Sequence, residues 1–172
     1  FHGDALFIVD PWIWLALATA LFLPHRTAWR VRLVGGLVVA YIMGMVAASA
    51  AAESIARRAA EGQGFTGIEE VLFQPAPGNP FVGELIVATR TEYRVGSFEW
   101  FSVTRVRLDG PAIARGDWAL PAVVRAARTE DGTDYLTWAR MPFVRVEVAG
   151  SDTVVVFGDA RFRTGPAAGG LQ

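Results

Sequence analysis

Hydrophobic and polar positions divide this chain into two parts. No charged residue occurs from Leu33 to Ala52, whereas from Gly83 onward a charged residue appears every few positions. The run Val31–Ala52 has the length of about 20 apolar residues that crosses a hydrocarbon core of roughly 30 Å. It therefore predicts a membrane-spanning helix, and its uninterrupted length disfavours the alternative of a buried helix in a soluble protein.

Small residues recur every four positions along this predicted helix, at Gly36, Ala40, Gly44 and Ala48. Residues four apart lie on one side of a helix, and a stripe of small side chains lets a second helix approach closely. A chain rich in alanine and glycine also produces such a stripe by chance. The pattern leaves both interpretations open.

An earlier apolar segment, Ala5–Leu23, is interrupted by Asp10 and Pro11. From Pro11 onward it has a length of roughly 20 Å at 1.5 Å per residue, too short to cross a bilayer unaided. Proline suits the first helical turn and a preceding aspartate can cap it. The segment predicts a helix that begins at Pro11, with Trp12 and Trp14 at the membrane interface. A kinked, continuous span with Asp10 partly buried is the alternative.

The loop between the two apolar segments is basic, with Arg26, Arg30 and Arg32. By the positive-inside rule it favours a cytoplasmic turn, with both ends of the chain on the opposite side of the membrane. Arg57 and Arg58, after the second segment, reduce this contrast.

The remainder of the chain changes from helical to β-type patterns. Residues 53–64 extend the second helix to Gly62 or Gly64. The stretch "QPAPGNP" is a turn-rich joint, because three prolines in seven residues forbid a helix. Short β-type runs follow, broken by Gly96 and by "DGP". "ALPAVVRAART" predicts a short helix, and "PFVRVEVAGSDTVVVFGDARF" a hairpin with Val144, Val146 and Val148 on one face.

Overall composition excludes several classes of function. The net charge of −1 argues against a general nucleic-acid surface, which requires a basic excess. The chain has no cysteine, so it has neither disulfides nor thiolate metal ligands. Nucleophile-elbow, phosphate-loop and EF-hand patterns are absent.

The candidate catalytic residues are Asp10, Asp4 and His2, all near the first apolar segment. Ionisable groups at membrane depth are costly and are commonly functional, although helix capping also accounts for Asp10. His2 and Asp4 are two residues apart, a spacing that points both side chains to one side of an extended backbone. They could complete a metal site with upstream ligands, or be ordinary polar residues beside an interface.

Two other groups of residues are open to a structural interpretation. Asp159 and Arg161 can form an ion pair on one strand face, worth at most about 1 kcal/mol if exposed. Trp100, Trp118 and Trp138 either line a groove or, as is more common in a small β-rich domain, pack in its core.

Five stretches in order give a family resemblance: "GDALFIVDPWIW", the small-residue span, "QPAPGNPF", "YLTWARMPFVRV" and "GDARF". Together, from Gly3 to about Phe162, they resemble the C-terminal part of the LexA-binding, inner-membrane-associated metal-dependent hydrolases. The resemblance implies a multi-pass protein of the bacterial inner membrane with a divalent metal such as zinc, and by the family's name a repressor protein as partner. It also implies that the metal-binding histidines lie in N-terminal spans.

This chain has only two histidines, His2 and His25, whereas a catalytic zinc usually has three protein ligands. Since the chain also begins with Phe1 rather than methionine, we expect it to be part of a longer protein whose main metal ligands lie upstream. The chain alone is then expected to be inactive and to bind no metal.

The sequence predicts a membrane α-helical hairpin of two hydrophobic helices over residues 1–64, a small β-rich α+β soluble domain over 65–163 and a disordered tail over 164–172. The predicted function is that of the C-terminal portion of an inner-membrane metal-dependent hydrolase with an unknown substrate. The alternative is a non-enzymatic, membrane-anchored binding or scaffold module. In both cases the bilayer is the predicted partner and nucleic acid is not.

Overall fold

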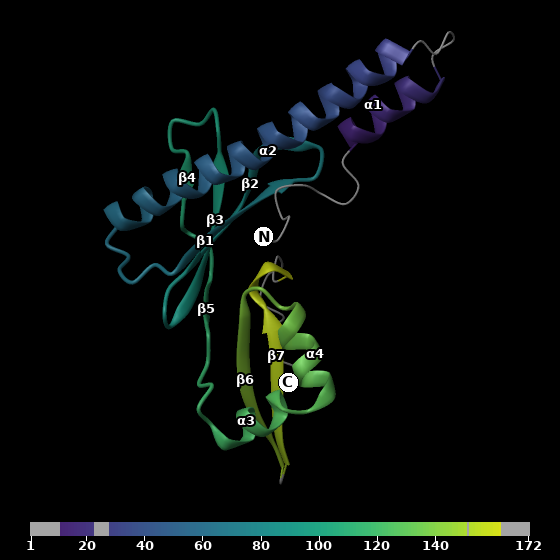
Figure 1. Ribbon diagram of the computed structural model, residues 1–172. Coiled ribbons are helices and arrows are strands. Elements are labelled where there is room, and N and C mark those ends of the chain that lie inside the picture. Colours follow the sequence, from purple (N-terminus) through teal and green to yellow (C-terminus); the bar gives the residue numbers. More distant parts are fainter. Residues whose placement is uncertain (1–10, 23–27, 151, 163–172) are drawn as a thin grey trace. The chain divides into compact units, whose positions relative to one another are not determined.

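The computed structural model describes residues 11–22, 28–150 and 152–162 (Figure 1). These residues form two compact units that alternate along the chain. The first unit takes its described residues from Phe1–Phe65, Val71–Leu85 and Gly96–Asp109. The second takes them from Thr66–Glu70, Ile86–Val95 and Gly110–Gln172. Since three strands pass from one unit into the other, each unit is described by itself.

The longest element of the first unit is the helix α2, Ala28–Gly62, with 35 residues. Its bounds confirm the helix predicted over Val31–Ala52 and the predicted extension to Gly62. At 1.5 Å per residue it is about 52 Å long. Among the described residues it is the one helix that is long and apolar enough to cross a membrane.

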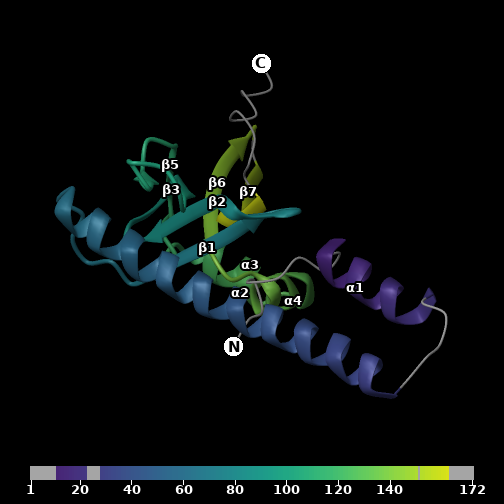
Figure 2. The ribbon, with the colours of Figure 1, turned by 90° about the horizontal axis from the view of Figure 1, so that it is seen from above.

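A shorter helix, α1, Pro11–Phe22, lies alongside the first part of α2 (Figures 1 and 2). It begins at Pro11, as the sequence predicts, and the indole Nε1 of Trp12 donates a hydrogen bond to the carbonyl of Gly78 (3.3 Å). Its 12 residues reach only about 18 Å, so the structure does not establish a membrane hairpin of two spanning helices. The predicted cap Asp10, and with it the alternative of a kinked span, lies outside the described residues.

One antiparallel sheet contains the first five strands, in the order β1-β2-β3-β4, with β5 also paired to β3. Their bounds are β1 Glu70–Ala76, β2 Asn79–Ala88, β3 Glu92–Glu99, β4 Val106–Arg107 and β5 Ala112–Ala114.

The predicted joint at residues 74–80 contains no helix, but it is a strand, a turn and a strand rather than a separate linker. Pro75 is accommodated because β1 is an edge strand, and Pro80 because it lies at the start of β2. Gly78 forms the turn with a φ of +74°.

The predicted break at Gly96 is wrong, since Gly96 lies inside β3. A Cβ at this position would overlap the carbonyl oxygen of Arg107 next to it in the sheet. Glycine here permits close approach of two strands instead of ending one. The chain turns instead between β2 and β3, at residues 89–91.

The core of the first unit forms where the second half of α2 passes across the strands (Figure 1). The helix buries Met45, Ala52, Ala56 and Ala60, and the strands bury Val71, Leu72, Phe73, Leu85, Phe98 and Val106. The rings of Phe73 and Phe98 meet edge to face, with centroids 5.3 Å apart. The small-residue spacing thus continues beyond Ala48 to Ala52, Ala56 and Ala60, where these alanines are buried in this core.

The second unit adds two helices, a hairpin and a final 3₁₀ turn. Their bounds are α3 Pro121–Ala127, α4 Glu130–Trp138, β6 Pro142–Ala149, β7 Asp152–Asp159 and η1 Ala160–Phe162. Both α3 and the hairpin confirm the prediction. The pattern missed α4, although its start has a recognisable signal: the Thr129 Oγ1 accepts a hydrogen bond from the Gly132 N–H (3.1 Å), and Glu130 and Asp131 occupy its first turn.

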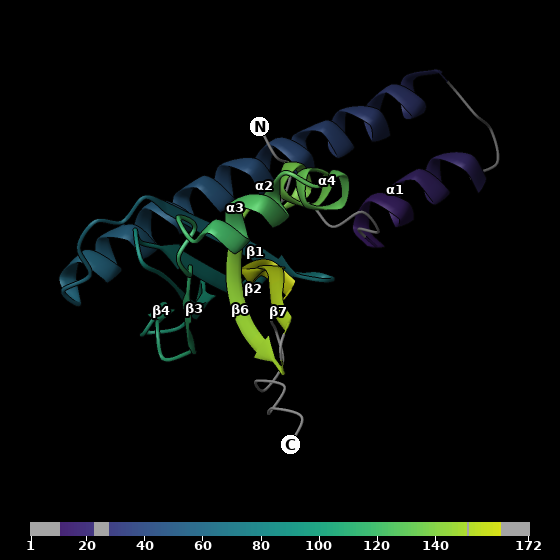
Figure 3. The ribbon, with the colours of Figure 1, turned by 90° about the horizontal axis from the view of Figure 1, so that it is seen from below.

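The β6–β7 hairpin is a separate two-stranded sheet. Its register pairs Val144 with Phe157 and Val146 with Val155, so the predicted valine face is correct. Only the start of this face is buried, however, because Val144 is in the core whereas Val148 is 79% exposed. The far end of the hairpin lies away from α3 and α4 (Figures 2 and 3).

Candidate functional site

The residues that the sequence predicts as catalytic, His2, Asp4 and Asp10, lie outside the described residues. Their geometry therefore enters none of the arguments below. Within residues 11–22, 28–150 and 152–162, no group of three or more histidines and acidic residues could hold a metal ion.

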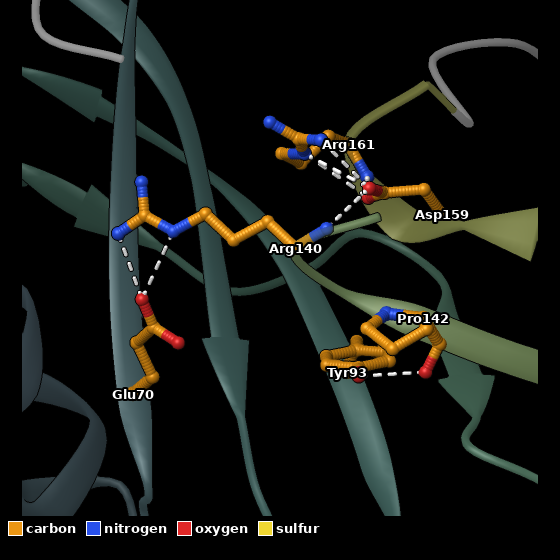
Figure 4. A network of polar contacts seen from close by, with 6 residues as sticks. All are labelled: Glu70, Tyr93, Arg140, Pro142, Asp159 and Arg161. Atoms are coloured by element: carbon orange, nitrogen blue, oxygen red, sulfur yellow. Dashed lines mark hydrogen bonds and ion pairs between the residues drawn. The ribbon is translucent and has the colours of Figure 1, made fainter. Parts of the chain in front are cut away.

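A buried polar network surrounds Asp159 at the end of β7 in the second unit (Figure 4). Its carboxylate accepts hydrogen bonds from the backbone N–H groups of Arg140 and Arg161, both at 2.9 Å, and from the Arg161 guanidinium at 2.8 Å. The side chains of Asp159 and Arg161 are only 1% and 9% exposed. The predicted ion pair is thus confirmed, but Arg161 lies in η1 rather than on the predicted strand face. The pair is also buried, so the energy expected for an exposed pair does not apply.

Burial alone would raise the pKa of Asp159. The hydrogen bonds from Arg161 and from the Arg140 backbone, together with the charge of Arg161, outweigh this effect and lower the pKa. The carboxylate is therefore ionised at neutral pH and both of its oxygens already accept hydrogen bonds. It is not available as a general base, and its role is to join the start of β6, the end of β7 and η1.

Two further contacts complete this network (Figure 4). The guanidinium of Arg140 donates to Oε1 of Glu70 from Nη2 at 2.8 Å and from Nε at 3.2 Å. The hydroxyl of Tyr93 donates to the carbonyl of Pro142 at 2.8 Å, and burial is the main reason that its pKa is raised. A phenol that remains protonated and donates to backbone has a structural role.

One acidic residue of the first unit has an unusual environment that the sequence does not indicate. Glu84 of β2 is half-buried, and desolvation raises the pKa of its carboxyl group.

An apolar groove lies in the first unit, between α2 and the sheet, with a volume of about 450 Å³. Its lining comes from three segments: Tyr41, Gly44, Met45 and Ala48 of α2, Pro80 and Phe81 of β2, and Trp100 and Phe101 after β3. This volume is within the range typical of small-molecule sites. The groove is therefore a candidate site for an apolar ligand.

Backbone and ring contacts hold the aromatic wall of this groove. The N–H of Trp100 donates to the carbonyl of Phe81 at 2.9 Å, which fixes the segment after β3 next to the start of β2. The Phe81 and Phe101 rings lie 5.1 Å apart, and Trp100 packs edge to face on Phe98, also at 5.1 Å. The wall is thus rigid on the Trp100 side, whereas Phe101 is 83% exposed.

The opposite wall is the small-residue stripe of α2. A Cβ added at Gly44 would meet no atom within 4 Å, and the same holds at Gly36. Within the described part of the chain, no other element therefore approaches these two positions closely, and Gly44 and Ala48 line the groove instead.

The three tryptophans considered together in the sequence have different environments. Trp100 lines the groove, as one of the two interpretations expects. Trp118 is half-buried and stacks on Phe157, with ring centroids 5.8 Å apart. Trp138 is exposed and stacks on Phe162 at 5.2 Å. Trp118 and Trp138 belong to the second unit and are not among the residues that line the groove.

The first half of α2 is apolar but unburied. Its exposed large side chains include Trp29, Val31, Leu33, Leu37, Val39 and Met43. Monomeric soluble proteins rarely expose contiguous apolar surface of this kind, and its presence marks a site of interaction with lipid or protein.

No family model, curated protein or solved structure matches this chain. The family resemblance described from the sequence therefore stays a prediction.

Proposed function

We propose that this chain is a membrane-anchored module in which α2 both crosses the bilayer and carries the β-rich part of the first unit. One observation supports this proposal above others. Up to Gly44 a single uninterrupted helix leaves most of its large apolar side chains exposed, and from Met45 onward it buries one side against the sheet. Two different surroundings, lipid and protein, suit these two halves.

The length and the flanking charges of α2 agree with this arrangement. From Trp29 to Ala48 the helix has a length of about 30 Å, the thickness of a hydrocarbon core. Arg30 and Arg32 lie near one end of this stretch, and Glu53 is the first charged residue beyond the other end. Long basic side chains near a helix end can extend to the interface. A transfer of this stretch into lipid would therefore bury no charge near the bilayer centre.

Flotation tests the proposal directly. The full chain is synthesised in the presence of phosphatidylcholine vesicles and separated on a density gradient, followed by extraction at alkaline pH. We expect the chain to float with the vesicles and to resist extraction. A chain that remains in the supernatant as a monodisperse species without surfactant would contradict the proposal.

Metal-dependent hydrolysis, the activity that the family resemblance implies, belongs by that prediction to a longer parent protein. His2, Asp4 and Asp10 would there complete a metal site whose main ligands lie upstream. Metal analysis of the parent protein and of its Asp10→Asn variant tests this. Loss of bound metal in the variant supports a ligand role for Asp10, whereas full retention of metal and activity indicates a helix cap.

A further inference from the structure

We propose that the apolar groove between α2 and the aromatic segments binds an acyl chain of a membrane lipid. This inference rests on the proposed membrane anchoring and adds a specific site to it. The groove is lined by Tyr41, Gly44, Met45 and Ala48 on the helix, and by Pro80, Phe81, Trp100 and Phe101 on the sheet side.

The position of the groove along α2 places it at the depth of the acyl chains. The exposed stretch Trp29–Gly44 has 16 residues and reaches about 24 Å, short of the roughly 30 Å that a hydrocarbon core requires. A helix that crosses fully must therefore continue in lipid for about four more residues, to Ala48. The residues of α2 that line the groove lie between Tyr41 and Ala48, in the last two turns of this span.

The chemistry of the lining fits a hydrocarbon chain at the edge of the bilayer. Its side chains are aliphatic or aromatic, with the tyrosine hydroxyl and the indole N–H as their only polar groups. Tryptophan and tyrosine are enriched where hydrocarbon meets headgroups. Phe101, which is 83% exposed on the sheet side, extends the apolar surface of the helix across the groove mouth.

The shape of the lining leaves room for an acyl chain. The groove has a volume of about 450 Å³, and a Cβ added at Gly44, on its helix wall, would meet no atom within 4 Å. An extended hydrocarbon chain is narrow and can lie between Gly44 and the aromatic wall. Lipid acyl chains surround this part of α2 whenever the helix crosses a bilayer, so they are the occupant that we propose.

Photo-crosslinking in vesicles tests this inference on the full chain. The probe is a phosphatidylcholine with a diazirine in one acyl chain, and labelled residues are mapped by mass spectrometry. In the unaltered chain we expect labels both on the exposed residues Leu37 and Val39 and on the groove residues Met45 and Trp100.

Two phenylalanine substitutions on the same helix provide a matched pair. Gly44→Phe places a ring at the groove wall, where the added Cβ meets no atom within 4 Å. Gly35→Phe has the same open surroundings but lies outside the groove lining. We expect Gly44→Phe to lower labelling of Met45 and Trp100 about tenfold, the loss for excluding two buried methylene groups. Gly35→Phe should leave this labelling unchanged.

The outcomes separate the two proposals. A chain that does not float contradicts membrane anchoring and the lipid site together. A chain that floats and is labelled at Leu37 and Val39, but not at Met45 and Trp100, contradicts the lipid site alone. Equal labelling of Met45 and Trp100 in Gly44→Phe and Gly35→Phe also contradicts the lipid site alone. Phe101→Ala provides a second measurement if Gly44→Phe fails to fold, because an exposed ring can be removed at little cost in stability and groove labelling should again fall.

Discussion

Replacement of Val39 by arginine distinguishes a lipid environment from water around the first half of α2. Val39 is 61% exposed and is one of the two central residues of the stretch Trp29–Ala48. If this surface faces water, an exposed substitution changes the free energy of unfolding by no more than about 0.5 kcal/mol. If it faces the bilayer centre, arginine costs about 2.5–3.5 kcal/mol in the free energy of insertion.

The expected effect follows from these two magnitudes. A penalty of about 3 kcal/mol lowers the ratio of inserted to uninserted chain about 100-fold. The assay compares the fraction of newly synthesised chain that floats with phosphatidylcholine vesicles and resists alkaline extraction. Ser54→Arg is the control, because Ser54 is exposed on the same helix beyond the predicted span. We expect it to float as the unaltered chain does.

One result would refute this reasoning. If the unaltered chain floats and Val39→Arg floats equally well, the middle of the exposed stretch does not lie at the bilayer centre, and a shallow interfacial position of α2 would be indicated instead. Equal losses for Val39→Arg and Ser54→Arg would show a general effect of added charge.

Three further predictions concern stability. Asp159→Asn breaks a buried ion pair and should lower the free energy of unfolding, measured in urea, by about 3 kcal/mol or more. Glu99→Gln is the control, because Glu99 and its partner Arg107 are 42% and 54% exposed. This control should change the free energy of unfolding by less than about 1 kcal/mol. The pKa of Asp159 is lowered in the folded protein, so its stabilising effect is present above the ordinary carboxyl value of 3.8 and is lost as the pH falls through the lower folded value. The loss of stability that this carboxylate causes in acid should therefore be absent from Asp159→Asn when the free energy of unfolding is measured against pH. The same pH dependence in the variant and the unaltered chain would contradict the lowered pKa. Gly116→Ala should destabilise the protein strongly, since Gly116 has a φ of +80° and a Cβ there would overlap the carbonyl oxygen of Val144. Gly64→Ala, with a φ of +88° and open surroundings, should cost only the backbone strain of about 1–2 kcal/mol. Equal melting temperatures for these two variants would show that the overlap is relieved.

The local pattern was sufficient for the elements that depend on neighbouring residues. The apolar run Val31–Ala52, which has no charge after Arg32, predicted a long helix, because backbone hydrogen bonds and side-chain spacing within the run specify it. Pro11 determined the start of α1, and the alternating valines after Pro142 determined a hairpin and its faces. The capping residue Thr129 was also a usable local signal for α4.

Contacts between distant segments were decided only by the tertiary structure. The sequence of α2 has no charge anywhere between Leu37 and Ala52, yet the sheet covers only the part from Met45 onward. Small residues every four positions indicated close packing, but they did not indicate that an apolar groove and a sheet would face them. The groove combines three segments that are up to 60 positions apart. The periodicity within one segment does not indicate which other segments it contacts.

Packing between distant segments also decides how much the pair of Asp159 and Arg161 contributes to stability. The spacing of Asp159 and Arg161 predicted a pair on one strand face, but the chain forms the pair by turning into η1 directly after Asp159. Whether the pair is worth a fraction of a kcal/mol or several depends on its burial, and burial is set by the strands and helices that pack around it. Sequence determines what each segment can form, and the packing of the segments decides which surfaces are left for water, lipid or a ligand.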